Sequence, residues 1–117
     1  MQGDVWTARA TDSELADEMV GYAVEGRDGT IGKVDRVNYG RTCVVVSTSR
    51  LFGKKYVIPI GAVERIDDAS EAIFVDLSKE EVEGSPEYDD DAGFDDQCEA
   101  TTGSYYADVL VRRASVR

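Results

Sequence analysis

Short apolar stretches separated by turn residues recur along the first two thirds of the chain, and they predict β-strands. The clearest turn is Asp28-Gly29, because Asp-Gly between extended segments is typical of a hairpin and Gly takes a positive φ without steric strain. The expected strands are residues 20–25, 30–39, 41–48, 55–60, 62–67 and 72–77. Six short strands at roughly ten-residue spacing predict a small β-barrel or a two-sheet roll, and therefore an all-β fold.

Two departures from a regular strand pattern add detail to this prediction. The apolar positions Ile31, Val34 and Val37 are spaced by three rather than two, which indicates a β-bulge near Gly32. Pro59 cannot donate a hydrogen bond to a neighbouring strand. We therefore expect it at a sheet edge or at the end of its strand.

Short helical segments are expected on either side of the strands. The run Ser78–Glu81 matches a capping box, in which Ser caps a helix and Glu reaches back to the cap. A single helical turn there should end before Pro86. Ahead of the first strand, Asp12 or Ser13 could cap a short helix that runs through residues 17–19 and places Leu15 and Met19 against one end of the barrel.

The charge of the chain is concentrated near its C-terminal end. The net charge is -11, and residues 83–99 contain eight acidic residues but no Lys or Arg. Such runs are usually solvated. We therefore expect a mostly irregular tail at 84–117 that is acidic and then basic. The barrel is expected at 14–83, and a loose segment at 1–13 precedes it. The negative charge also argues against direct binding of nucleic acid.

Carboxylates are abundant in the chain, but the sequence shows no recognisable catalytic constellation. The chain has no His, which removes His-based acid–base catalysis, Ser–His or Cys–His nucleophiles and His-ligated zinc. Cys43 lies in an apolar run and Cys98 in the tail; a disulfide between them is left open. A calcium loop beginning at Asp89 would need Gly and Glu where Phe94 and Ala100 stand. We expect a protein that is not an enzyme and that has no cofactor and no metal site.

No segment indicates export or membrane insertion. The first ten residues lack the apolar core of a secretory signal. The longest largely apolar stretch, residues 56–63, is far shorter than the roughly 20 residues of a spanning helix. The sequence therefore predicts a cytoplasmic protein that does not insert into membranes.

An ordered series of motifs resembles the PRC-barrel family. The series covers residues 15–90 and consists of Gly21-Tyr22-x-Val24, Asp28-Gly29-Thr30-Ile31-Gly32-Lys33-Val34, Val44-Val45-Val46, Phe52-Gly53-Lys54-Lys55, Ile58-Pro59, Ala62-Val63-Glu64-Arg65-Ile66-Asp67, Val75-Asp76-Leu77-Ser78-Lys79-Glu80 and Ser85-Pro86-Glu87-Tyr88-Asp89. Members of that family are small β-barrels, found in the photosynthetic reaction-centre H subunit and in a ribosome-maturation factor. Both are interaction roles, so the resemblance implies a docking or assembly module.

One loop is a candidate partner-binding site. Residues 50–55 place three positive charges and two apolar side chains together in an acidic protein: Arg50, Leu51, Phe52, Lys54 and Lys55. An aromatic anchor surrounded by charge suits a protein partner. The alternative interpretation is a connection in which Phe52 packs into the barrel mouth while the lysines stay hydrated.

Three functions remain open from the sequence. The first is a non-enzymatic module that binds itself, as a homodimer, or another protein through barrel edges and loops. The second is a ribosome- or RNA-processing accessory that acts through a ribosomal protein. The third is a small-ligand or metal-binding sensor that uses the barrel mouth as its pocket.

Overall fold

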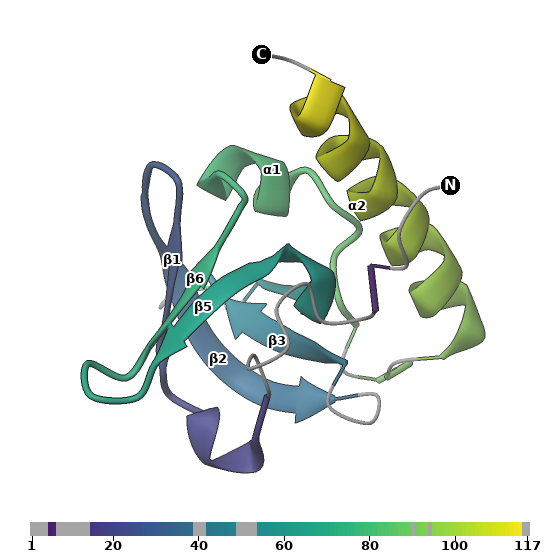
Figure 1. Cartoon of the computed structure of the whole chain (residues 1–117). Coiled ribbons are helices and arrows are strands. Elements are labelled where there is room, and N and C mark those ends of the chain that lie inside the picture. Colours follow the sequence, from purple (N-terminus) through teal and green to yellow (C-terminus); the bar gives the residue numbers. More distant parts are fainter. Residues whose placement is uncertain are drawn as a thin grey trace.

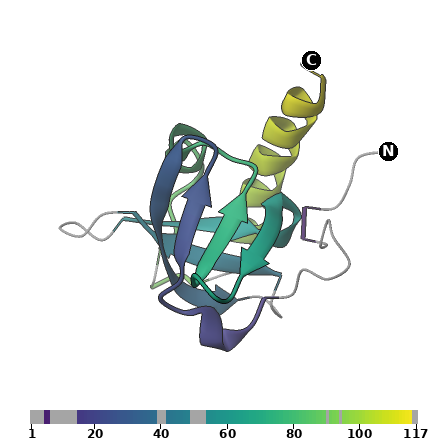
Figure 2. The same ribbon diagram turned by 60° about the vertical axis from the view of Figure 1, so that its left-hand side comes forward.

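Six strands form one sheet in the computed structural model, which describes residues 5–6, 15–38, 42–48, 54–89, 91–93 and 95–115 (Figures 1 and 2). The strands are β1 (Ala23–Gly26), β2 (Gly29–Asn38), β3 (Cys43–Ser47), β4 (Lys55–Pro59), β5 (Val63–Asp67) and β6 (Ala72–Val75). Their order in the sheet is β4-β3-β2-β1-β6-β5. β1 and β6 are parallel, and all other neighbours are antiparallel. No ladder between described residues joins β4 to β5, so the expected barrel is not closed.

The hairpin and the bulge that the sequence predicts are confirmed. β1 and β2 pair up to Gly26 and Gly29, and Gly29 has a φ of 133°. The register shifts opposite Val24 and Glu25, which leaves Ile31 as the extra residue beside Gly32. A Cβ on Gly32 would clash with the Ser47 carbonyl oxygen. Glycine at this position therefore allows β2 to cross close to the end of β3.

Pro59 has both roles that the sequence allows, since β4 ends there and is an outermost strand of the sheet. The chain then turns through the 3-10 helix η2 (Ile60–Ala62) into β5. The outer edge of β4 is partly covered, because the Tyr88 amide donates to the Lys55 carbonyl over 2.8 Å. The segment after α1 thus pairs with an edge that the sheet alone would leave open.

The core lies on the concave face of the sheet, around which β2 bends in Figure 1. The helix predicted ahead of β1 is described only as the 3-10 helix η1 (Asp17–Met19), whose N-cap residue is Ala16, and the predicted caps Asp12 and Ser13 lie outside the described residues. Leu15 and Met19 are buried in the core, as expected. A second, smaller cluster on the other face contains Cys43, Val45, Val57 and Tyr88. Because β3 contributes to both clusters, its apolar run is continuous rather than alternating.

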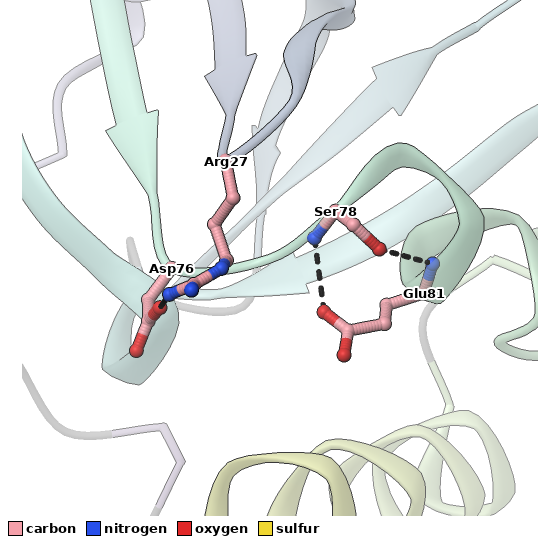
Figure 3. Close-up of polar contacts among 4 residues, drawn as sticks. All are labelled: Arg27, Asp76, Ser78 and Glu81. Carbon is pink, nitrogen blue, oxygen red and sulfur yellow. Dashed lines mark hydrogen bonds and ion pairs between the residues drawn. The ribbon is translucent and has the colours of Figure 1, made fainter. Parts of the chain in front are cut away.

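The predicted capping box is present at the start of α1 (Lys79–Glu83) (Figure 3). The Glu81 amide donates to Ser78 Oγ over 3.1 Å, and the Ser78 amide donates to Glu81 Oε1 over 2.9 Å. The tip of the β1–β2 hairpin supports the same junction, because Arg27 pairs with Asp76 at 2.8 Å (Figure 3). The Arg27 amide also donates to the Leu77 carbonyl.

The prediction of a mostly irregular tail is wrong. Residues Asp96–Ser115 form a 20-residue helix, α2, which stands beside α1 in Figure 1. Thr102, Tyr106 and Val109 are buried, at the i, i+4 and i+7 spacing of a single helix face. The acidic start and the Thr-Thr-Gly centre hide this period, and packing against the rest of the fold stabilises the helix. Among the described residues, no helix is long and apolar enough to cross a membrane.

Candidate protein-binding groove

Residues Val5 and Trp6, which we call the N-terminal strap, pack against the fold, although no sequence pattern predicts this contact. Val5 is buried, and its carbonyl accepts a hydrogen bond from the Gly61 amide over 2.7 Å. A Cβ on Gly61 would lie 2.5 Å from the Val5 carbonyl oxygen and 2.9 Å from its Cα. The missing side chain at Gly61 therefore creates the space in which the strap lies.

The other side of the strap meets α2. Trp6 is half-buried and packs against both hydrophobic clusters. A Cβ on Gly103 would lie 3.1 Å from Trp6 Nε1 and 3.4 Å from its Cζ2. The indole therefore rests almost directly on the helix backbone. In Figure 1 the strap lies beside α2, and in Figure 2 it lies next to η2 as well.

An open groove of about 430 Å³ runs between the strap and α2. Besides Val5 and Trp6, it is lined by five residues of α2, namely Glu99, Ala100, Gly103, Ser104 and Ala107. Their spacing of three or four positions places them along one side of the helix. Four of the five are small, so the helix backbone itself comes close to the groove.

Two tyrosines fix α2, and hence one wall of the groove, to α1 and the turn after it. Tyr105 Oη donates to the Glu81 carbonyl over 2.7 Å. Tyr106 Oη donates to Ser85 Oγ over 3.2 Å, and Ser85 Oγ donates to the Val82 carbonyl over 2.6 Å. Burial raises the pKa of Tyr106 well above its usual range. The helix is therefore held by hydrogen bonds as well as by apolar contacts.

The end of the groove near the start of α2 is acidic. Asp95 Oδ1 accepts the Cys98 amide over 2.8 Å and so caps the helix. Asp96 is exposed and Glu99 is half-buried, and both lie on the same side of the helix as Gly103 at i, i+3 and i+7. The nearest described cation on α2, Arg112, lies on a later turn and already pairs with Asp108 at 2.7 Å. The groove thus combines an indole, a small-residue wall and the Glu99 carboxylate, with Asp95 and Asp96 at the start of the same helix.

The two cysteines lie in the smaller cluster but form no disulfide. Burial raises the pKa of the fully buried Cys43 thiol to about 12, with a further contribution from Cys98. Burial also raises the pKa of Cys98. Both thiols are therefore protonated at neutral pH, which is the opposite of what an activated nucleophile requires. Within the described ranges, no three His, Cys, Asp or Glu residues come together as metal ligands.

The loop chosen from the sequence is placed only in part. Arg50, Leu51 and Phe52 lie outside the described residues. Lys54 is exposed, whereas Lys55 begins β4 and its Nζ lies 3.4 Å from Asp35 Oδ2. Partner binding through this loop therefore stays a prediction.

The groove itself was missed in the sequence analysis. The available signal was the period of Thr102, Tyr106 and Val109, which would have revealed α2 and its small-residue side. Nothing in the sequence indicated that Trp6 would pack against Gly103, because this contact depends on the tertiary fold.

Neither the family models nor the curated proteins contain a match to the sequence. Among solved structures, the chain is similar to a 16S ribosomal RNA processing protein, RimM, from Pseudomonas aeruginosa. The identity is 21% and the TM-score 0.46, over 63% of this chain and 50% of the other. The chain thus spans about half the length of that protein. A likeness at this TM-score supports no argument about function, and the resemblance to the PRC-barrel family stays a prediction.

Proposed function

We propose that this chain is a non-enzymatic interaction module that binds a protein partner through the groove between the N-terminal strap and α2. The observation that carries the proposal is the groove itself, about 430 Å³ in volume and lined by Trp6 beside a wall of small residues. Aromatic side chains in concave sites are the usual anchors of protein interfaces. We also propose that the module catalyses no reaction. The raised pKa values of both thiols support this part of the proposal, because they disfavour a reactive thiolate.

The hydrogen bonds that attach both walls to the fold also support a binding role. The strap is attached through its backbone to Gly61, and α2 is attached through Tyr105 and Tyr106 to the region of α1. A preformed groove requires little ordering when a partner binds, so more of the contact energy becomes affinity. Interaction through the groove thus requires no rearrangement of the sheet.

A groove-filling substitution tests the proposal. Ser104→Trp places a large side chain on the groove wall, and Thr101→Trp places the same side chain on an exposed position of α2 that does not line the groove. Each variant would be cross-linked in native lysate, and captured proteins would be quantified by mass spectrometry against the wild type. We expect a partner that is enriched by the wild type and by Thr101→Trp but lost with Ser104→Trp. A partner retained by Ser104→Trp would place binding elsewhere.

Self-association is a second candidate, and the topology favours one strand for it. β4 and β5 are the outermost strands, and the segment containing Tyr88 already covers part of β4. β5 is therefore the strand through which two copies would pair across a two-fold axis. Sedimentation equilibrium tests this candidate, and a monomer at high concentration would exclude it.

The RNA-processing alternative depends on experiment alone, because the likeness to RimM is too weak to support it. The net charge of -11 favours contact with a basic protein over contact with phosphate. Co-migration with ribosomal particles at low salt, lost with Ser104→Trp, would identify the partner as a ribosomal protein. If the chain does not migrate with these particles, the alternative is wrong.

A further inference from the structure

We propose that the groove binds a segment of the partner protein that presents an arginine side chain, with the guanidinium held between the Trp6 indole and the Glu99 carboxylate. This inference rests on the proposed function and adds the chemistry of the partner to it. Trp6 and Glu99 line the same groove, one from the strap and one from α2. An aromatic ring and a carboxylate are the two groups that proteins most often use to bind a cationic side chain.

Among the described residues, the charges around the groove disfavour an anionic or a purely apolar segment. An anionic segment would face Glu99 in the groove, and the net charge of the protein is -11. A purely apolar segment would cover the half-buried Glu99 carboxylate and leave it without a partner, which is unfavourable. A cationic side chain avoids this unfavourable burial, because it pairs with the Glu99 carboxylate when the segment fills the groove. The electrostatics therefore select a basic occupant.

The small residues of α2 provide room for the aliphatic part of such a side chain. Ala100, Gly103 and Ala107 lie along the groove and offer short, apolar surfaces. Long cationic side chains commonly lay their methylene groups on such a surface while the charged end reaches a polar partner. A groove of about 430 Å³ lies at the small end of ligand sites, so it suits one or two side chains rather than a whole helix.

Arginine fits this pair of groups better than lysine. The guanidinium is planar, so it can stack on the indole and direct two N–H groups at one carboxylate. The lysine ammonium is more strongly hydrated and has no flat face. We therefore expect arginine to be preferred over lysine at equal charge, which a purely electrostatic attraction would not produce.

The test uses the full chain and three short peptides of the same length, containing arginine, lysine or citrulline at the same positions. Citrulline keeps the shape of arginine but has no charge. Because Trp6 is the single tryptophan of the chain, its fluorescence reports on the groove, and calorimetry gives the affinity. We expect saturable binding of the arginine peptide, weaker binding of the lysine peptide and about tenfold or greater loss with citrulline.

Two matched variants separate the groove from the overall charge. Glu99→Gln removes the groove carboxylate, and Glu83→Gln removes one exposed charge that does not line the groove. We expect about tenfold weaker binding with Glu99→Gln and a change of less than about twofold with Glu83→Gln. Equal losses in both variants, equal affinities for the three peptides, or no saturable binding would each overturn the inference.

The outcome is distinguishable from a failure of the proposed function. If a partner is captured by the wild type, is lost with Ser104→Trp and is unaffected by Glu99→Gln, the groove binds protein but not through a cation. If no partner depends on the groove in the capture experiment, the proposed function itself fails, whatever the peptides do.

Discussion

Gly103 lies so close to Trp6 that a Cβ at position 103 would be 3.1 Å from the indole nitrogen. Glycine is a poor residue for the middle of a helix, because it lowers helix stability by about 1 kcal/mol relative to alanine. Its presence at the centre of α2 is explained by this contact, since any side chain would press on the indole. The helix therefore gives up intrinsic stability in favour of a close contact with the strap.

We predict that Gly103→Ala moves the indole without unfolding the protein. The new methyl group requires a shift of a few tenths of an ångström, and the far end of a half-exposed side chain can provide it. The gain in helix propensity, up to about 1 kcal/mol, should then make the variant slightly more stable. Tryptophan fluorescence and thermal unfolding check both parts. Unchanged emission would show that the indole is not in contact with Gly103, and Thr101→Ala, at an exposed position of α2 that does not line the groove, is the control.

We predict that Gly61→Ala displaces the strap. Here the added Cβ would meet backbone atoms of Val5 at 2.5 and 2.9 Å, and backbone cannot move aside as a side chain can. Losing the burial of Val5 should lower the free energy of unfolding by about 1–3 kcal/mol. Trp6 emission should shift to longer wavelength while the circular dichroism of the sheet stays the same.

The double variant Val5→Ala with Gly61→Ala is the control for this prediction. If the strap is already displaced, the second substitution adds little, so the two effects are not additive. Full additivity would mean that Gly61→Ala destabilises the protein in some other way.

We predict that Tyr106→Phe lowers the free energy of unfolding by about 1 kcal/mol, the usual contribution of one buried hydrogen bond. The substitution removes the donor to Ser85 Oγ and keeps the buried ring. Tyr106→Ala also removes the ring and should cost about 3–5 kcal/mol. Urea unfolding measures both, and equal losses would show that the hydroxyl rather than the packed ring attaches α2.

The same tyrosine predicts alkaline sensitivity. Burial favours the neutral phenol, so the folded pKa of Tyr106 lies above the unfolded value. Its contribution to stability is therefore complete below the unfolded pKa of about 10 and is lost as the pH rises above it. Tyr106→Phe should be less sensitive to this rise, as measured by urea unfolding at pH 8 and above pH 10. An identical loss of stability in both proteins would contradict this prediction.

We predict that the two thiols react with a disulfide reagent in a fixed order. Cys98 is half-buried and should react slowly in the native protein, whereas the fully buried Cys43 should react only on unfolding. The rise in the Cys43 pKa from 9.0 to about 12 reduces its thiolate fraction by about a thousandfold near neutral pH. Labelling of Cys98→Ser in the native state should therefore be negligible, and rapid labelling would contradict the burial.

Local patterns predicted the parts of the fold that depend on local interactions. The hairpin at Asp28-Gly29, the bulge beside Gly32 and the capping box at Ser78 each result from residues within a few positions of one another. Curvature and closure of the sheet depend on contacts between distant strands, and the predicted barrel is accordingly open in the structure.

The candidate site could not be predicted in the same way. α2 depends on the burial of Tyr106 and on its hydrogen bond to Ser85, 21 positions earlier in the chain, and its own sequence is poor in helix formers at Thr101, Thr102 and Gly103. The groove depends in addition on Trp6, from the other end of the chain. Residues 50–55 stand out by their composition alone. Composition gives the charge of a segment, but it does not predict which residues the fold places beside that segment.

The contact between Trp6 and Gly103 also bears on the order of events during biosynthesis. The strap is synthesised before α2, so the surface of α2 on which Trp6 packs does not exist until residues 96–115 have been made. A contact between residues so far apart in the sequence closes a long loop, so it tends to form late in folding. A nascent chain can therefore complete its sheet while still lacking the groove. The groove therefore exists only in chains in which α2 has been made and has packed against the strap.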